Sequence, residues 1–526
     1  HVRSLGGLGA YASLAVRGAA PGHTAILIDG VPLARLAAVT TDLGRFSLDA
    51  FGEVDLYRGA VPIELGGAGV GGALNLITRL GAGAGGERVA GSLGVGSYGA
   101  RHLRVRYGDV LGGWRHATTL GYQAATGDYR YYDDHSTPLN PRDDDEQVRR
   151  NNDFAAVDLA TRWGSADGGV VVGARAQTKR QGLPGSIATP AFAARLTTTD
   201  ALADATITTG DDALTGRHQA YALLEHQRLD DPAGELGLGA ATRAFLTLAG
   251  GASTTWAAAL GPHRARLGGE LRAEAFRDRD ATGAQPTQSG HRLAGAVLAS
   301  ADLVLDPATA RVRITPAVRL ERVRTAPTPM TAGPDALIPV PRRDDTLASP
   351  RLSARWAITD AVTAKGSAGW YTRLPTLLEL FGDRGFVVGS PTLRAERGPS
   401  VDLGAVWAPP GALGAVDRVL VEAAGFAHRA HDAIALVSTA GFAAHAVNLN
   451  DTDGWGGELV GAARVAGVLS VTASYTRLVT AQRAGDPSTN GKPLPRAPGH
   501  ALAARAEAEQ VLAGRAVAAW LDASWQ

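Results

Sequence analysis

Carboxylates gather in one polar stretch of this 526-residue chain, directly after two aromatic residues, Tyr131 and Tyr132. Five aspartates lie within it, namely Asp133, Asp134, Asp143, Asp144 and Asp145. Calcium prefers oxygen ligands, which clustered carboxylates supply. The spacing is not that of an EF-hand loop, so a solvated acidic loop is the alternative interpretation. The stretch is therefore a candidate structural Ca²⁺ site, and no cofactor is expected to be required.

Other reactive groups lack the arrangements that catalysis or cofactor binding needs. The chain has no Cys, which excludes disulfides, thiolate metal sites and cysteine nucleophiles. Its 13 His residues show no H-E-x-x-H spacing, and G-x-S-x-G and Walker A patterns are absent. Residues 67–72 match G-x-G-x-x-G, but the strand-like run 74–78 follows where a dinucleotide site needs a helix. We therefore expect that the protein is not an enzyme.

Composition favours a β protein without a nucleic-acid partner. Lys and Arg number 52 against 51 Asp and Glu, so the net charge of +1 gives no electrostatic reason to expect nucleic acid. The 67 glycines exceed ordinary usage of about 7% by nearly twofold. Because glycine disfavours helix interiors, a large helical protein is not expected.

Alternating residues predict the elements that position these groups. Leu267 and Leu271 alternate with Arg266, Glu270 and Arg272. The same period of two recurs around residues 103–107, 312–321, 351–358 and 469–476. Such strands have one apolar and one polar face. A soluble sandwich would place the apolar face inside, whereas a membrane barrel would turn it toward lipid.

Several features favour the barrel. Trp and Tyr lie near strand ends, and a short turn at 112–113 is followed by a long polar stretch at 128–152. Short turns on one side and long loops on the other are typical of outer-membrane barrels. The charge-free runs 244–262 and 433–450 are broken by Gly, Ser and Thr, which favours hairpins over spanning helices. Residues 1–80 lack long alternating strands and are predicted to be a separate small unit, followed by a barrel over 81–526.

An ordered set of motifs in residues 1–80 resembles the plug domain of TonB-dependent outer-membrane receptors. The set is Arg17-Gly18, then I-L-I-D-G-V-P-L at 26–33, E-V-D-L-Y-R-G at 53–59, and the glycine-rich G-G-A-L-N-L-I-T-R at 71–79. The barrel adds L-P-T at 374–376 with E-L-F-G at 379–382, G-G-E at 456–458, and L-P-R-A-P-G-H at 494–500. Ser390 stands where the family usually has Asn.

The resemblance implies an all-β, antiparallel transmembrane barrel of about 22 strands in the full protein, with a small α+β plug inside its lumen. The family's TonB box and first plug strand are expected upstream of His1, and its final strands beyond Gln526. The chain is therefore expected to be cut short at both ends.

The resemblance also implies a function in the bacterial outer membrane. A receptor of this kind binds a scarce large solute, with a ferric siderophore or cobalamin expected here, and imports it to the periplasm. Its expected partners are outer-membrane lipid and the TonB–ExbB–ExbD energy-coupling complex, and it is expected to be a monomer. The alternatives are a passive or plugged porin-like channel and a soluble β-sandwich binding protein.

The resemblance directs attention to three groups of residues. Ligand contacts are expected from the plug apex and an outer loop, at Arg35, Thr40, Asp42, Arg45, Tyr131 and Tyr132. Charged plug residues are expected to latch the plug to the barrel, namely Arg17, Glu53, Arg58 and Arg79, with Arg104, Arg106, Glu270 and Arg272 as candidate wall partners. Calcium in the outer loops of the family's vitamin-B12 receptors supports the acidic stretch as a Ca²⁺ site.

Overall fold

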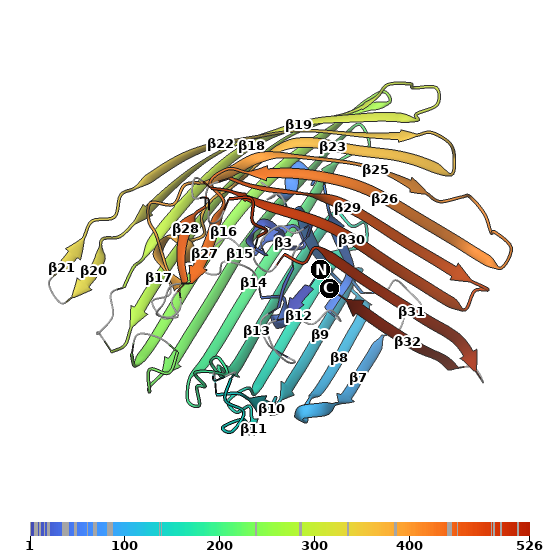
Figure 1. Ribbon diagram of the computed structural model, residues 1–526. Helices are drawn as coiled ribbons and strands as arrows, with labels where there is room; N and C mark the ends of the chain where they lie inside the picture. The colour runs from blue at the N-terminus through green and yellow to red at the C-terminus, as the bar shows by residue number, and fades with distance from the viewer. Residues whose placement is uncertain are drawn as a thin grey trace.

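Nineteen strands form a closed barrel (Figure 1), and the neighbouring strands from β7 along the chain to β32 pair in antiparallel. The computed structural model describes residues 2–4, 9, 12–14, 16–17, 21–33, 42–46, 50–59, 61–66, 71–81, 88–135, 137, 139–236, 239–282, 287–333, 336–382, 387–438, 444–449, 451–484, 487, 490–494, 497–512 and 515–525. The barrel strands are β7 (Val89–Val95), β8 (Arg101–Leu111), β9 (Trp114–Ala125), β12 (Phe154–Ser165), β13 (Val170–Gly182), β14 (Arg195–Gly210), β15 (Leu214–Asp231), β16 (Ala241–Leu260), β17 (His263–Asp280), β18 (Gly290–Val304), β19 (Val312–Pro327), β22 (Arg343–Ala357), β23 (Val362–Arg373), β25 (Glu396–Trp407), β26 (Val416–Ala430), β29 (Asp451–Val465), β30 (Leu469–Arg483), β31 (His500–Leu512) and β32 (Arg515–Trp525). About 22 strands are predicted for the full protein.

The connections differ at the two ends of the barrel. One end has tight turns, such as Gly112-Gly113 between β8 and β9, where both glycines have positive φ. The other end has long connections that carry further elements, and we call it the long-loop end. Those elements are η5 (Ser97–Gly99), β10 (Arg130–Asp133), β11 (Asp145–Val148), β20 (Met330–Gly333), β21 (Ala336–Ile338), α1 (Leu377–Phe381), β24 (Val387–Val388), β27 (Ile434–Ser438) and β28 (Ala444–Asn448). In outer-membrane barrels the long loops are extracellular.

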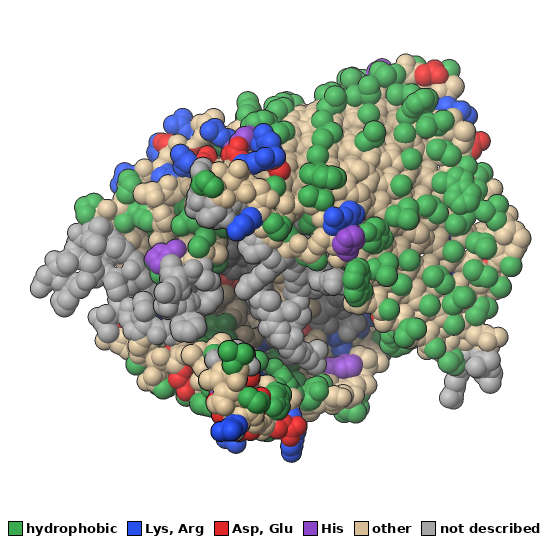
Figure 2. Space-filling view, viewed as in Figure 1, with side chains coloured by type: hydrophobic (Ala, Val, Ile, Leu, Met, Phe, Trp, Pro, Cys, Tyr) green, Lys and Arg blue, Asp and Glu red, His purple; other side chains and the backbone are tan. Residues whose placement is uncertain are grey.

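The wall is apolar outside and polar inside. On β17 the outward Leu267 and Leu271 are 65% and 67% exposed, whereas Arg272 and Glu274 are buried in the lumen. Figure 2 shows apolar side chains spread over the wall, with most charged side chains toward its ends. This polarity is the reverse of a soluble sandwich, and the closed ring excludes that alternative.

The N-terminal unit lies within the ring in Figure 1. Its main sheet has the order β4-β3-β6-β5, with β3 (Ala25–Ile28), β4 (Val31–Pro32), β5 (Phe51–Tyr57) and β6 (Ala73–Thr78). The other elements are β1 (Val2–Ser4), β2 (Ala12–Leu14) and the 3-10 turns η1 (Pro21–His23), η2 (Leu43–Arg45) and η4 (Ile63–Leu65). The apolar runs of β3 and β6 pair in parallel and form the core of the plug. The boundary predicted at residue 80 falls between β6 and β7, and remains a prediction.

Two charge-free runs are predicted to be hairpins, and the structure confirms one of them. The run 433–450 contains the antiparallel hairpin β27–β28, as predicted. The run 244–262 was wrongly predicted as a hairpin, because residues 241–260 form the single strand β16. Its glycines are tolerated there because β15 and β17 pair with it on both sides. No helix among the described residues is long and apolar enough to cross a membrane.

At the long-loop end, two loops pack into the mouth of the barrel. Leu377, Leu380 and Phe381 of α1 form a buried cluster with Ile434 of β27. The same cluster includes the lumen-facing Phe245 and Phe276 of β16 and β17. The Thr376 hydroxyl accepts from the amide of Glu379 while the Glu379 carboxylate accepts from the amide of Thr376, so a capping box begins the helix. Burial of these apolar side chains holds the two loops over the lumen.

Candidate functional site

Two plug arginines bind carboxylates on one side of the barrel. Arg17 Nε lies 3.2 Å from Glu458 Oε2 on β29, and Arg58 Nη1 lies 3.4 Å from the same oxygen. Arg58 Nη2 also donates to Glu422 Oε1 on β26 at 2.7 Å. Glu458 therefore joins two separate segments of the plug to the wall.

The plug backbone approaches this wall closely. A Cβ at Gly59 would overlap the carboxylate of Asp402 on β25, so only glycine fits without a shift. Asp402 Oδ2 also lies 3.9 Å from Arg17 Nη1. Further along β25, Glu396 Oε2 lies 2.7 Å from His23 Nε2 of the plug, and Glu396 also accepts from Arg373. We call Glu396, Asp402, Glu422 and Glu458 the plug-facing acids.

Asp29 lies in a tight turn of the plug and also pairs with the barrel wall. The sequence predicts a tight turn at Asp29-Gly30, and both residues have positive φ, 53° and 85°, between the antiparallel strands β3 and β4. In addition, the Asp29 carboxylate accepts from the amide and hydroxyl of Thr78 and lies 2.6 Å from Arg162 Nη1 on β12. The sequence does not indicate this ion pair between the plug and the wall.

The charges on β17 and β19 pair along the wall instead. Arg272 Nη1 and Arg319 Nη2 both donate to Glu270, at 2.9 and 2.7 Å. Glu321 accepts from the same two arginines at 3.0 and 3.3 Å. We call these four residues the wall cluster. Three of them are less than 10% exposed, so the pairs lie largely away from water.

The wall residues predicted to pair with the plug latch have described partners on the wall, and their pairing with the plug remains a prediction. Arg104 binds Asp158 of β12 in two hydrogen bonds, and Glu270 and Arg272 belong to the wall cluster. These long side chains reach along the lumen face across the intervening strand, β9 between β8 and β12 and β18 between β17 and β19. Arg106, partly buried on β8, remains a predicted partner of the plug.

Half of the predicted latch residues contact barrel carboxylates. Arg17 and Arg58 do so, as described above. Glu53 is exposed on β5, and Arg79 donates to the carbonyl of Phe51 within the plug. Neither Glu53 nor Arg79 has an ion pair with the barrel within the described ranges. The assignment of a latch function to all four residues remains a prediction.

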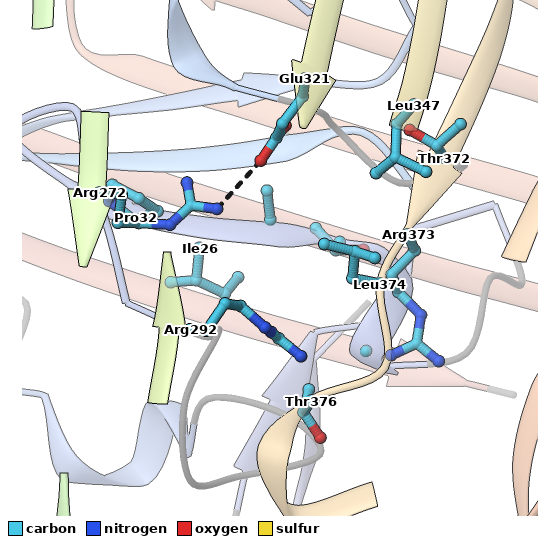
Figure 3. Close-up of a pocket in the computed structure, with 13 residues that line it drawn as sticks. Ile26, Pro32, Arg272, Arg292, Glu321, Leu347, Thr372, Arg373, Leu374 and Thr376 are labelled. Carbon is cyan, nitrogen blue, oxygen red and sulfur yellow. Dashed lines mark hydrogen bonds and ion pairs between the residues drawn. The ribbon is translucent and has the colours of Figure 1, made fainter. Parts of the chain in front are cut away.

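Two cavities lie between the plug and the wall. The first is small, about 70 Å³, and plug residues Thr24, Ile26 and Pro32 line it. Figure 3 shows Arg272, Arg292 and Glu321 of the wall around it, with the Arg272–Glu321 pair marked. The second is larger, about 500 Å³, and lies between the β3–β4 turn and the wall. Its polar wall residues include Arg217, Ser253, Thr255 and Glu270.

Most of the predicted plug-apex contacts cannot be placed. Arg35 and Thr40 lie outside the described residues, and Arg45 lies in η2 with its side chain outside the described part. Asp42 is described, and its Oδ1 accepts from the amides of Ala12 and Gly44 at 2.9 Å. Lys179 Nζ of β13 lies 3.8 Å from Asp42 Oδ2. Asp42 thus holds plug segments together and faces a wall cation.

The outer loop places both predicted tyrosines on the β10–β11 hairpin. Tyr132 is 69% exposed, and its hydroxyl donates to Asp144 at 2.9 Å. This hydrogen bond is the main reason that the pKa of Tyr132 is raised above its ordinary value. Tyr131 stacks edge-on with Tyr129, with ring centroids 6.3 Å apart. An exposed phenol beside another aromatic pair could contact a large ligand, and that role remains a prediction.

Four of the five aspartates proposed for calcium have protein partners in the described loop. Asp133 accepts from the amide of His135, and Asp145 lies 3.2 Å from the His135 Nε2. Asp143 accepts from the hydroxyl of Thr137, and Asp144 from Tyr132. Within the described part of the chain, no three His, Cys, Asp or Glu side chains converge as a metal site. Calcium binding, including any contribution from Asp134, remains a prediction.

Sequence reasoning did not single out the plug-facing acids. Glu458 lies in the G-G-E motif at 456–458, and Glu396 lies shortly after Ser390. Neither position indicates by itself that the carboxylate contacts the plug. Period-two alternation could have placed Glu422 and Glu458 on the lumen face, because the apolar neighbours Val421 and Leu459 lie on the other face. Which lumen carboxylates meet the plug depends on contacts between residues about 400 positions apart.

Comparisons with known proteins agree with this architecture. Residues 97–520 match the family model described as TonB dependent receptor-like, beta-barrel, and residues 1–73 match the TonB-dependent Receptor Plug Domain. The chain belongs to the TonB-dependent receptor family. With its barrel fold, this membership makes it a bacterial outer-membrane protein. Members of the family are transporters.

Individual relatives cover different shares of the receptor. A 107-residue segment is 33% identical to the vitamin B12 transporter BtuB of Vibrio cholerae, covering 20% of this chain and 17% of that protein. The copper transporter OprC superposes with a TM-score of 0.74 at 16% identity, over 97% of this chain and 80% of the other. The ferric yersiniabactin uptake receptor FyuA from Yersinia pestis gives 0.69 at 15% identity, over 100% and 81%. At these identities the structural likeness establishes the fold.

Proposed function

We propose that this receptor actively imports a scarce large solute across the outer membrane to the periplasm. One observation carries the proposal: a folded plug occupies a closed barrel and is attached to it by ion pairs of Arg17 and Arg58. A plug of this kind opposes free diffusion, and salt bridges are contacts that a pulling force can break and that can re-form. The TonB–ExbB–ExbD complex is the proposed source of that force, and the receptor is proposed to work as a monomer.

The proposed cargo is a ferric siderophore or a cobalamin-like molecule. Similarity of one segment to a vitamin B12 transporter and of the fold to a ferric yersiniabactin receptor supports this class. The fold is also similar to a copper transporter. Copper(I) sites favour thiolate and thioether ligands, whereas this chain has no Cys and one Met. A solute that arrives already chelated therefore fits the composition better than a bare copper ion.

Binding and uptake test this proposal separately. Purified full-length receptor is titrated with ⁵⁷Co-labelled cyanocobalamin and with a panel of ⁵⁵Fe-loaded siderophores, and cells carrying or lacking the receptor are assayed for uptake. We expect one probe to bind and to enter only receptor-bearing cells with an intact proton gradient. Binding of neither class would contradict the proposed cargo, and uptake that survives an uncoupler would contradict active import.

A passive channel is the second candidate, since a plugged barrel with cavities beside the plug could still leak. Planar-bilayer conductance of the full-length receptor distinguishes the two. We expect no steady current from the importer, whereas a sustained ohmic current would favour the channel. We propose no catalytic role for the protein.

A further inference from the structure

The plug contacts its barrel unequally around the circumference. On β25, β26 and β29, the plug-facing acids bind His23, Arg17 and Arg58 of the plug. On β17 and β19, the wall cluster binds within itself. Between the plug and β17–β18, the described ion pairs reduce to Arg266 with Glu64, 3.8 Å apart.

This difference determines where the plug can separate from the wall most easily. Moving the plug away from β25–β29 would leave Glu458 without Arg17 and Arg58, and would leave Glu422 with Lys365 of β23 but without Arg58. An unpaired charge in a desolvated site is strongly unfavourable. Moving it away from β17–β19 leaves the wall cluster intact, because each of its members keeps its partners on the wall. The β17–β19 side therefore has the lower electrostatic barrier to opening.

Both cavities border this side, and the first extends to β22 and β23 while the second extends to β12 and β15. Arg272 lines the first cavity and Glu270 lines the second, and both are wall-cluster residues on β17. They are two positions apart on the lumen face, so their backbone positions differ by about 7 Å along the strand. The first cavity reaches Arg373 and Thr376 toward the long-loop end, and the second reaches Thr215 and Arg217 near the tight turn before β15.

We propose that the imported solute passes between the plug and strands β16–β19, while the plug stays attached to β25, β26 and β29. The wall cluster forms the side of this path without having to exchange partners. Ser253 and Thr255 of β16 present hydroxyl groups to it from the second cavity. The proposal rests on the proposed function, because it locates the route of an import that the coupling complex drives.

The absence of Cys from the chain allows a direct test by single substitutions. Ser253→Cys places a thiol in the second cavity. Ala424→Cys is the matched control, because Ala424 lies between Glu422 and Phe426, which face Arg58 and Arg17 of the plug. Living cells carrying each variant receive a membrane-impermeant thiol reagent, with or without an uncoupler. The rate of thiol labelling can be measured without knowing which ligand the receptor binds.

We expect the thiol of Ser253→Cys to react severalfold faster in energised cells, with Ala424→Cys unaffected by the uncoupler. Faster labelling of Ala424→Cys alone, or equal acceleration at both positions, would overturn the proposed route while leaving active import standing. No energy-dependent change at either position would contradict both the route and the coupling. Failure of the proposed route and failure of the proposed function are thus distinguishable.

A second measurement uses the solute itself. A bulky maleimide adduct at Ser253→Cys should abolish uptake of the labelled cobalamin or ferric siderophore that binds, without changing the amount bound to cells. The same adduct at Thr255→Cys should act alike, and at Ala424→Cys it should leave uptake unchanged. Normal uptake through receptors fully modified at Ser253→Cys would overturn the proposal.

Discussion

The β25–β29 wall and the β16–β19 wall of this barrel both carry charged side chains on the lumen face, but the partners of these charges differ. The first wall offers carboxylates that are completed by plug cations, as in the pairing of Glu458 with Arg17 and Arg58. The second has both signs on its own lumen face, so that Arg319 pairs with Glu321 on the same strand and with Glu270 across β18. Whether a lumen charge attaches the plug therefore depends on which groups lie opposite it, since Glu422 and Glu396 bind plug cations while also pairing with Lys365 and Arg373 of the wall. Charge sign alone does not decide this.

The largest expected effect comes from the acid that two plug arginines share. Glu458→Gln removes the negative charge and leaves Arg17 and Arg58 with fewer partners. Because these groups are mostly buried, we expect plug attachment to weaken by about 3 kcal/mol. Urea titration of the full-length receptor in detergent, followed by proteolysis of the plug, measures the change. Glu422→Gln should have a smaller effect because Glu422 contacts only one plug arginine. Equal effects would contradict the shared role of Glu458.

The close approach at β25 gives the second prediction. Gly59→Ala forces the Asp402 carboxylate to move, since the added methyl group would overlap it. We expect a loss of about 1–3 kcal/mol in plug attachment from overpacking, in the same urea assay. Gly30→Ala provides a contrast on the cavity side. The nearest atom to its Cβ would be Gln219 Oε1 at 3.4 Å, an ordinary contact, although its φ of 85° adds backbone strain of its own. The Gly59 result would be contradicted if the barrel absorbed the methyl group without loss.

The third prediction separates barrel stability from plug attachment. Arg319→Gln leaves Glu270 and Glu321 with one cation fewer in a buried site, so the barrel itself should melt at a lower temperature. Plug release in urea should change by less than about 1 kcal/mol, because Arg319 binds wall residues. Circular dichroism of the barrel and proteolysis of the plug report the two effects independently. If Arg319→Gln weakened plug attachment as much as Glu458→Gln does, the difference between the two walls would be contradicted.

The smallest effect is local and depends on pH. Glu235 accepts from the amides of Ala193, Phe192 and Ala194, which ties two outer loops together, and these backbone hydrogen bonds lower its pKa. A lowered pKa means that the link is complete above the ordinary glutamate range and is lost as the pH falls through the lowered value. Amide exchange at 192–194 should be protected at neutral pH in the wild type. Glu235→Gln should remove most of that protection at every pH, and full protection in this variant would contradict the link.

Several features of the candidate site were accessible from the sequence. Arg17 and Arg58 fell within plug motifs, and their pairing with barrel acids agrees with the expected latch. Glu53 and Arg79 were predicted on the same grounds, yet the described structure gives them no barrel partner. The difference arises because motif membership fixes the place of a residue in the plug, whereas the direction of its side chain depends on which wall strand lies opposite.

The sequence by itself determined the class of fold and the polarity of the wall. Leu267 and Leu271 alternate with Glu270 and Arg272, and a period of two assigns them to opposite faces whatever the neighbouring strands are. Only the tertiary structure decided that Glu270 and Arg272 would bind within the wall while Glu458 would bind the plug. Ion pairing needs atoms within about 4 Å of each other. That proximity arises from strand register and from contacts between residues hundreds of positions apart, which no local pattern encodes.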